Sequence, residues 1–182
     1  MSSVSSRTTF NIVDIARVLA GILLLNAVAS WWFTSSPTWG YSGKWINQRY
    51  LKHRIFGSHV TLTIQELSLR NGSDENLPIY IAIDGRVYDV TASRHIYGPQ
   101  GPYSFFSGKD ASRAFVTGCF RKADEFTYDL RGLDPEEAKA DIQSWQDYFE
   151  KSSKYWCVGT VIHDPLTGDP PEPCDHKKYP HL

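Results

Sequence analysis

Cysteine is scarce in this chain: among its 182 residues only Cys119, Cys157 and Cys174 occur, and no two of them form a CxxC pair. Three scattered cysteines are too few for a disulfide framework, and without a CxxC pair a zinc site of that kind is excluded. We therefore expect a reducing compartment, with Cys119 and Cys157 as small buried apolar side chains. An excess of charge of one sign is missing too, because the formal net charge is -1 and the sequence pI is about 6.6. This balance argues against a nucleic acid as partner.

Aromatic residues, in contrast, are abundant. They make up 14% of the sequence, with 10 Tyr, 9 Phe and 6 Trp. Such a set suits either a large core or a pocket for a flat apolar ligand. The chain is long enough for one domain of ordinary size with extensions at its ends.

One long apolar run follows a small, polar stretch over residues 1–11 that we expect to be disordered. Residues 12–33 are mostly apolar, and a helix needs about 20 such residues to cross a bilayer. Asp14 and Arg17 lie three positions apart and are expected to pair near the membrane edge. Tryptophans close the run, as is typical of a membrane–water boundary. The sequence predicts a transmembrane helix here, with a cleaved signal peptide or a buried core helix as alternatives.

Basic residues around this run predict its orientation. The N-terminal flank offers Arg7 and Arg17, whereas the flank on the C-terminal side carries Lys44, Arg49, Lys52 and Arg54. By the positive-inside rule the C-terminal side faces the cytosol, and the glycosylation sequon at Asn71 then stays unused. The expected location is the endoplasmic reticulum, as a single-pass membrane protein. Residues 34–58 are interpreted as a juxtamembrane spacer.

The remaining pattern predicts one α+β domain over residues 59–163. Its clearest element is a β-hairpin, in which the runs 79–83 and 86–90 are joined by the two-residue turn Asp84-Gly85. A closing strand is predicted over residues 155–162. From position 164 to 182 the chain is polar and rich in proline, so we expect a disordered tail.

Helices are predicted from their capping signals. Thr63–Glu66 has the form of a capping box before a short helix. Asp110 is expected to be the N-cap of a helix over residues 111–120. Asp134-Pro135 opens a longer helix, because an Asp cap followed by Pro favours a first turn. At helical spacing, its buried face would carry Ala138, Ile142, Trp145 and Phe149.

The most distinctive segment is a loop, Tyr97-Gly98-Pro99-Gln100-Gly101-Pro102-Tyr103. Pro fixes φ and Gly allows conformations closed to other residues, so this segment is a shaped loop that presents two phenols. The later pair Lys154-Tyr155 adds a cation and a third phenol, and a nearby cation stabilises a phenolate. A phenolate is a ligand for ferric iron, and Tyr is one of the axial ligands of haem. The plainer interpretation makes each Tyr a core aromatic or a binding platform.

Two neighbouring runs complete the pattern around this loop: IAIDGRVYDVT at 81–91 and FSGKDASR at 106–113. Together the three runs resemble the membrane-associated progesterone receptor (MAPR) family, with the fungal members nearest in style. The likeness covers roughly residues 61–163. It implies a cytochrome b5-like heme/steroid-binding domain, with a small sheet and short helices, behind one N-terminal membrane helix.

The resemblance also implies a site and a function. Tyr103 would be the axial ligand of ferric haem b, and Tyr97, Lys154 and Tyr155 would lie in the same pocket and support the haem. The implied role is that of a membrane-tethered accessory protein for haem-thiolate monooxygenases in sterol or specialised-metabolite biosynthesis. A sterol or another apolar small molecule is a further candidate ligand, and a homodimer stacked through haem is left open.

Three alternatives stand beside this interpretation. A bis-histidine electron carrier is disfavoured, because no His-Pro-Gly-Gly motif occurs and only His95 lies beside the loop. A haem-dependent biosynthetic enzyme would need an acid or base, for which Asp110 and His95 are the candidates. A sterol-binding module without haem explains the aromatic residues but leaves Lys154 unexplained. Arg113 is expected either to pair with a haem propionate or to form a surface salt bridge.

Overall fold

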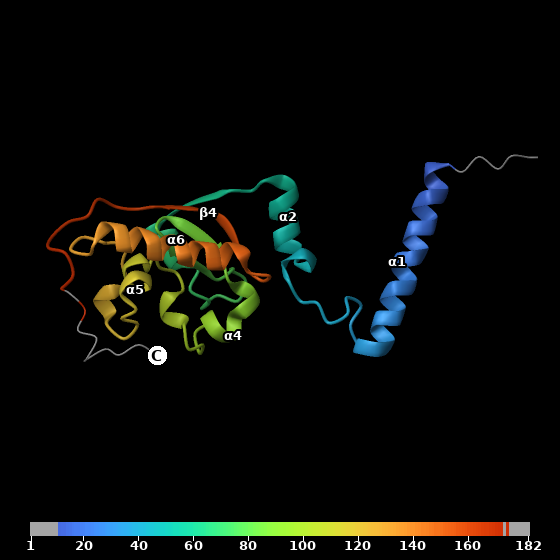
Figure 1. The fold of residues 1–182 in the computed structure, drawn as a ribbon, viewed down its shortest axis with the longest axis horizontal. Coiled ribbons are helices and arrows are strands. Elements are labelled where there is room, and N and C mark those ends of the chain that lie inside the picture. Colours follow the sequence, from blue (N-terminus) through green and yellow to red (C-terminus); the bar gives the residue numbers. More distant parts are fainter. Residues whose placement is uncertain (1–10, 173, 175–182) are drawn as a thin grey trace, which may run out of the picture. The chain divides into compact units, whose positions relative to one another are not determined.

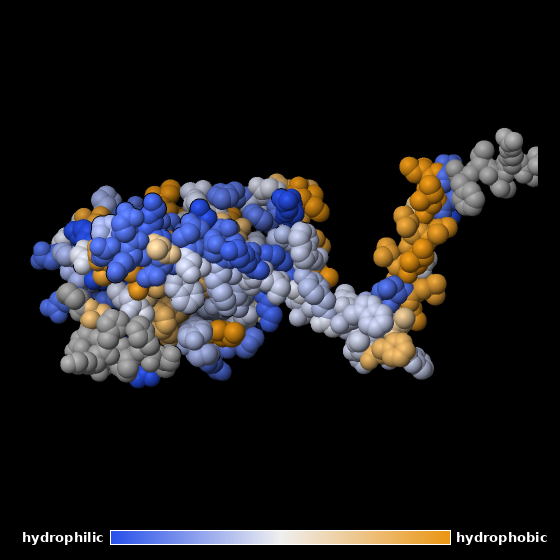
Figure 2. All heavy atoms as spheres, viewed as in Figure 1, coloured by the Kyte–Doolittle hydropathy of each residue, from blue (hydrophilic) through white to orange (hydrophobic). Residues whose placement is uncertain are grey.

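The computed structural model describes residues 11–172 and 174, and it divides the chain into two compact units, Met1–Ser42 and Gly43–Leu182. The first unit is built on α1 (Ile12–Thr34), which Asn11 and Asp14 open with a capping box (Figure 1). This helix is long and apolar enough to cross a bilayer, and Figure 2 shows apolar residues along its length. The predicted pair forms, with Arg17 Nη1 3.0 Å from Asp14 Oδ1.

The second unit combines a sheet with short helices, which confirms the predicted α+β class. Its strands are β1 (Val60–Thr63), β2 (Tyr80–Ile83), β3 (Arg86–Asp89) and β4 (Trp156–Ile162). Its α-helices are α2 (Gln48–Phe56), α3 (Ile64–Ser68), α4 (Arg94–Tyr97), α5 (Ser112–Thr117) and α6 (Pro135–Lys151). Short 3₁₀ turns are η1 (Lys44–Ile46), η2 (Thr91–Ser93), η3 (Ser104–Phe106) and η4 (Ala123–Glu125).

The four strands form one mixed sheet in the order β1-β4-β3-β2. The predicted hairpin is confirmed, because β2 and β3 pair antiparallel, with Tyr80 opposite Asp89 and Ile83 opposite Arg86. Both turn residues have positive φ, 50° at Asp84 and 77° at Gly85, and such a turn matches the twist of the strands. The closing strand β4 lies between β3 and β1 and runs parallel to β1.

Alternating side chains of the strands build a core on each face of the sheet. Ile81, Ile83 and Tyr88 belong to the cluster that α5 and α6 complete, which also holds Phe115 and Phe149. Ala82, Val87 and Trp156 belong to the other cluster, with side chains from α2 and β1: Tyr50 and Leu62. The period of two along each strand therefore divides the apolar residues between two layers of helices.

Two of the predicted helix starts are confirmed. Thr63 and Glu66 form the capping box that opens α3. The Asp134 side chain accepts hydrogen bonds from the backbone N–H groups of Glu136 and Glu137, and Pro135 begins α6. Three of the four residues predicted for the buried face of α6 are buried, and the fourth, Trp145, is half-buried. A residue of that face not predicted is Gln146, which is buried and donates from Nε2 to Ile83 O at 3.0 Å.

The prediction for Asp110 was wrong in the bounds of the helix and incomplete in the role of the side chain. Helix α5 ends at Thr117, because Gly118 takes the left-handed conformation that closes a helix, and its N-cap position is Ala111. The buried Asp110 carboxylate accepts from the backbone N–H of Ser112 at 3.2 Å, as a cap would, but it also accepts from Gly85 N at 2.8 Å and from the Ser112 hydroxyl, and it meets the ring of His163. Asp110 thus ties the hairpin turn to the end of β4.

The His163–Asp110 pair makes stability depend on pH. His163 Nε2 lies 2.8 Å from Asp110 Oδ2, and the hydrogen bond to this carboxyl group raises the pKa of His163. A raised folded-state pKa stabilises the protein fully below the unfolded value of about 6.5, and this is lost as pH rises through the folded value. In urea unfolding we expect His163→Gln to cost on the order of 1–2 kcal/mol near pH 6 and less above pH 8.

The exposed His59, changed to Gln, is the matched control and should show no such pH dependence. A cost of His163→Gln that stays constant between these pH values would mean that the imidazole does not ionise in this range.

The interpretation of residues 34–58 as a spacer was wrong for its second half. Residues 44–56 fold onto the domain, because Tyr50 of α2 is buried and its ring packs on Trp156 with 5.3 Å between centroids. Lys44 adds a backbone hydrogen bond from its N–H to Ser153 O at 2.6 Å. One buried aromatic in a mostly polar helix was too weak a signal to assign α2 to the core.

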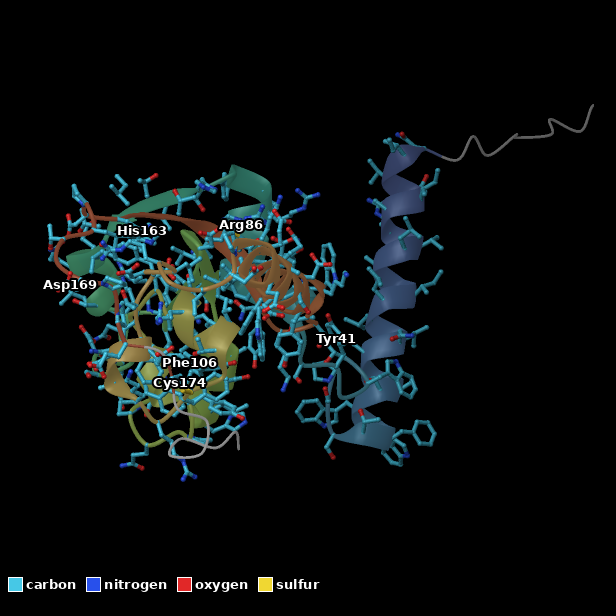
Figure 3. All side chains as sticks on the ribbon, turned by 60° about the vertical axis from the view of Figure 1, so that its left-hand side comes forward. Tyr41, Arg86, Phe106, His163, Asp169 and Cys174 are labelled. Atoms are coloured by element: carbon cyan, nitrogen blue, oxygen red, sulfur yellow. A yellow bond between two sulfur atoms is a disulfide. The ribbon has the colours of Figure 1, made fainter. Side chains whose placement is uncertain are left out.

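The prediction of a disordered tail also differs from the structure, which describes residues 164–172 and Cys174. Arg131 Nη1 donates to Gly168 O at 3.2 Å, and Lys122 Nζ donates to Glu172 O at 2.8 Å. Cys174 forms a disulfide with the buried Cys119 (Figure 3), which corrects the expectation that Cys119 is only a small apolar side chain. Pairing across 55 positions is not visible in sequence spacing. Position 173 and residues 175–182 lie outside the described residues.

Candidate functional site

The Gly/Pro loop is closed by backbone contacts that only glycine permits. Tyr103 N donates to Ile96 O at 3.0 Å, and Gly101 N donates to Gly98 O at 2.8 Å. A Cβ atom on Gly101 would lie 2.1 Å from Ile96 O, and one on Gly98 would lie 2.4 Å from Arg94 O. Both glycines are therefore required by the close approach of the backbone, and the loop holds Tyr97 and Tyr103 at its two ends.

The structure brings three of the four predicted site residues together. The Tyr97 ring lies 6.3 Å from the Tyr103 ring and 6.0 Å from the Tyr155 ring, between centroids. The Tyr155 hydroxyl donates to Ser93 Oγ at 2.8 Å. The fourth residue, Lys154, is exposed and has no recorded side-chain contact with these tyrosines.

Burial separates the chemistry of the three phenols. Tyr97 and Tyr155 are buried, and desolvation raises the pKa of both hydroxyl groups. They are therefore neutral hydrogen-bonding groups at physiological pH. Tyr103 is 36% exposed, and within the described part of the chain its hydroxyl has no hydrogen-bond partner. Of the three, Tyr103 is the phenol that is free to meet a ligand.

Apolar rings surround the inner side of Tyr103. Its ring lies 6.0 Å from Phe105 and 6.1 Å from Phe106, between centroids. Phe106 (Figure 3) is buried and packs in turn on Phe115, Phe120 and Phe126. The exposed phenol thus stands at the edge of a continuous aromatic cluster.

The remaining candidates lie elsewhere. His95 is exposed and lines a cavity of about 560 Å³ with Arg94 and Gly98–Gly101. Asp110 is buried against His163. Arg113 is neither a surface residue nor open to a propionate, because its side chain is 1% exposed and pairs with the buried Glu125. Both expectations for Arg113 were therefore wrong. Its partner Glu125 lies 12 positions away in the sequence, so the buried position of Arg113 could not be predicted from its neighbours.

Sequence reasoning missed one tyrosine of this cluster. Tyr148 on α6 is exposed, and its charge, when ionised, raises the pKa of both Tyr97 and Tyr155. Its ring packs on Trp145 and on Phe149, the residues predicted for the buried face. The aromatic run at these positions was the signal, but helical spacing placed Tyr148 outside that face.

Comparisons with known proteins identify the class. A model of the family described as "Cytochrome b5-like Heme/Steroid binding domain" matches residues 63–162, more than half of the chain. The chain belongs to this family. Its relatives include proteins named as membrane steroid-binding and membrane-associated progesterone-binding, which places the chain in the MAPR family, as the sequence resemblance predicted.

Two curated relatives show the extent of the likeness. "Membrane steroid-binding protein 1" of Arabidopsis thaliana is 44% identical over 118 residues, which cover 63% of this chain and 52% of the relative. "Neuferricin" of Danio rerio is 37% identical over 118 residues, covering 65% of this chain and 43% of the relative. The chain thus spans about half the length of such relatives. These organisms are a plant and a fish, and the fungal style of the chain stays a prediction.

A solved structure supports the fold. An Arabidopsis thaliana protein described as having a cytochrome b5 like fold superposes with a TM-score of 0.51 at 41% identity. The match covers 58% of this chain and 93% of that protein. The predicted cytochrome b5-like fold, with its small sheet and short helices, is therefore confirmed.

Proposed function

We propose that this chain is a membrane-anchored haem-binding protein of the MAPR type that holds ferric haem b through the Tyr103 phenolate. The observation that carries the proposal is the contrast among the three tyrosines: Tyr97 and Tyr155 are buried and the Tyr155 hydroxyl is bonded to Ser93, whereas Tyr103 is exposed with its hydroxyl unpaired in the described residues. The residues present fit the group, because a free phenol beside a cluster of phenylalanines offers an iron ligand and an apolar seat.

Each protein group has a distinct part in this proposal. Tyr103 supplies the ligand oxygen, and bound ferric iron supplies the charge that keeps the phenol deprotonated near neutral pH. Tyr97 and Tyr155, kept neutral by burial, form the buried side of the site, where the Tyr97 ring packs next to Tyr103. Lys154 adds a positive charge next to Tyr155 in the chain. Phe105 and Phe106 exclude water from one side of the site.

A second candidate function is the binding of a sterol or similar small apolar molecule. Names of relatives such as membrane steroid-binding protein favour this ligand class. A cavity of about 390 Å³ beside α6 has the size for one, and apolar side chains line part of it: Leu130, Leu133, Ala138 and Ile142. An enzymatic role has less support, because Asp110 is buried against His163 and the cavity that His95 lines does not include Tyr103.

Titration of the full chain in detergent with hemin tests the haem proposal. We expect a high-spin ferric absorption spectrum with a phenolate-to-iron charge-transfer band, because one oxygen ligand gives a weak axial field. A low-spin spectrum of the bis-imidazole kind would contradict Tyr103 as ligand. Absence of hemin uptake, with saturable binding of a steroid, would leave the sterol-binding module as the function.

We further propose that the bound haem supports haem-thiolate monooxygenases of sterol or specialised-metabolite biosynthesis in the same membrane. The apolar helix α1 and the membrane-protein names of the relatives fit a single-pass membrane protein. Turnover of a co-reconstituted monooxygenase should rise with the haem-loaded wild-type chain. An equal rise with a chain that does not bind haem would contradict the proposal.

The domain is proposed to face the cytosol from the endoplasmic reticulum, because basic residues follow α1. The Cys119–Cys174 disulfide argues for the opposite side, since disulfides persist in oxidising compartments. The exposed Asn71 provides the test. In eukaryotic cells we expect no endoglycosidase-sensitive shift on gels, as for the control Ser73→Ala, which removes the sequon. Glycosylation at Asn71 would place the domain in the lumen.

A further inference from the structure

Large apolar side chains are exposed at unusual density on the segment that precedes the sheet. Between positions 45 and 56, the exposed fractions are 71% for Ile55 and 77% for Phe56, and three more large apolar residues are exposed: Trp45, Ile46 and Leu51. The segment is not a loose linker, because Tyr50 buries the opposite side of α2 against Trp156. Its apolar side chains are therefore held outward by a folded helix.

The spacing along α2 groups the exposed apolar side chains of this helix, Leu51, Ile55 and Phe56, away from Tyr50. Leu51 and Ile55 are four positions apart, as are Lys52 and Phe56, so each pair is adjacent on the helix surface. Tyr50 occupies the side that packs on the sheet. Figure 2 shows this pattern at α2, where apolar and hydrophilic residues lie next to each other.

The charge of the same segment has one sign. Residues 43–59 contain four lysines and arginines and neither Asp nor Glu. Lys44 is turned inward, where Nζ donates to Glu150 O at 3.1 Å, and Arg49 lies 3.9 Å from Asp89. Lys52 and Arg54 are exposed, and within the described part of the chain their side chains form no hydrogen bond or ion pair. They remain available for an external anionic surface.

The tether between this segment and α1 is short. Trp39 is fixed to α1, since its N–H donates to Ser30 Oγ at 2.6 Å and its Nε1 donates to Asn26 Oδ1 at 3.1 Å. Lys44 is fixed to the domain through Ser153. Only residues 40–43 lie between these anchor points, so the five steps from Trp39 to Lys44 span at most roughly 18 Å.

We propose that the outer face of residues 45–56 docks on an anionic lipid bilayer surface and fixes the orientation of the domain on the membrane. Exposed aromatic and aliphatic side chains with flanking cations are the composition that inserts at the headgroup boundary. An anionic leaflet attracts each cation near its surface, and the apolar side chains add buried area. A protein partner is less favoured, because the face combines unpaired positive charge with a short link to an apolar helix.

Hydrogen–deuterium exchange of the full chain in nanodiscs tests the proposal. In discs of phosphatidylcholine mixed with phosphatidylserine, we expect the amides of residues 51–57 to exchange about tenfold more slowly than in phosphatidylcholine alone. Ile55→Ser with Phe56→Ser should abolish this protection, and Lys52→Glu with Arg54→Glu should abolish its dependence on phosphatidylserine. The matched control is Leu69→Ser, which changes an exposed leucine at the C-terminal end of α3. This variant should keep the wild-type protection and its dependence on phosphatidylserine.

Two results would overturn the proposal. Equal exchange in both kinds of disc and in detergent would show that the face does not meet lipid. Protection in detergent that rises with protein concentration would instead assign the face to contact with a second copy. Thermal unfolding of each variant, expected to match the wild type because the changed side chains are exposed, separates loss of docking from loss of fold.

Discussion

Tyr103→Phe is expected to abolish the phenolate-to-iron band and to weaken hemin binding on the order of 100-fold or more. We expect at least this loss of affinity, because removing a side chain that only orients a metal ligand already lowers metal affinity about 10–100-fold. The change deletes one oxygen atom from a side chain that is 36% exposed and forms no hydrogen bond within the described residues, so the fold should not be affected. Equilibrium titration followed by absorption spectroscopy measures both effects.

Tyr148→Phe is the matched control for this experiment. It removes the other exposed phenol of the aromatic cluster, and we expect the band to persist and the hemin affinity to change less than about threefold, within the usual range for a surface substitution. A band that survives in Tyr103→Phe and disappears in Tyr148→Phe would move the ligand to α6. A band that survives in both variants would remove tyrosine ligation by this cluster altogether.

The sequence predicted best those elements whose signals are local. The Asp84-Gly85 turn, the capping box at Thr63–Glu66 and the Asp134-Pro135 helix start each depend on neighbours within four positions, and all three are confirmed. The Gly/Pro loop belongs to the same class, since its glycines are fixed by carbonyls only four and five positions away. The family resemblance extended this local information to the whole fold.

The errors share the opposite cause. Asp110 looked like a helix cap and does accept from Ser112 N, but its other partners are the hairpin turn and His163, which lies 53 positions later. Tyr50 looked like a linker residue because its packing partner, Trp156, comes from the last strand. The pairing of Cys119 with Cys174 likewise depends on where the tail runs. Contacts of this kind join residues far apart in the sequence, so they cannot be predicted without the order of the strands in the sheet.

Among the residues that the sequence predicted wrongly, Arg113 is the one expected to matter most for stability. Its side chain is 1% exposed, and Nε lies 3.4 Å from Oε1 of Glu125, which is fully buried. Three backbone carbonyls complete its surroundings, because Nη1 donates to Asp129 O and Arg131 O and Nη2 donates to Pro171 O. Glu125 is held in turn by the Thr117 hydroxyl, which donates to Oε2 at 2.6 Å. The pair therefore links α5, the η4 turn and the tail.

Glu125→Ala should accordingly lower the free energy of unfolding by about 3–5 kcal/mol, because it leaves the guanidinium buried without a counter-charge. Urea unfolding followed by circular dichroism measures the loss. Asp147→Ala is the matched control: it breaks the exposed Asp147–Lys151 pair on α6 and should cost far less, because solvent screens an exposed ion pair. The double change Arg113→Met with Glu125→Leu should recover much of the loss, since replacing a whole buried pair by apolar groups is often neutral. Similar costs for Glu125→Ala and Asp147→Ala would show that water reaches Arg113, and that the tail does not seal this ion pair.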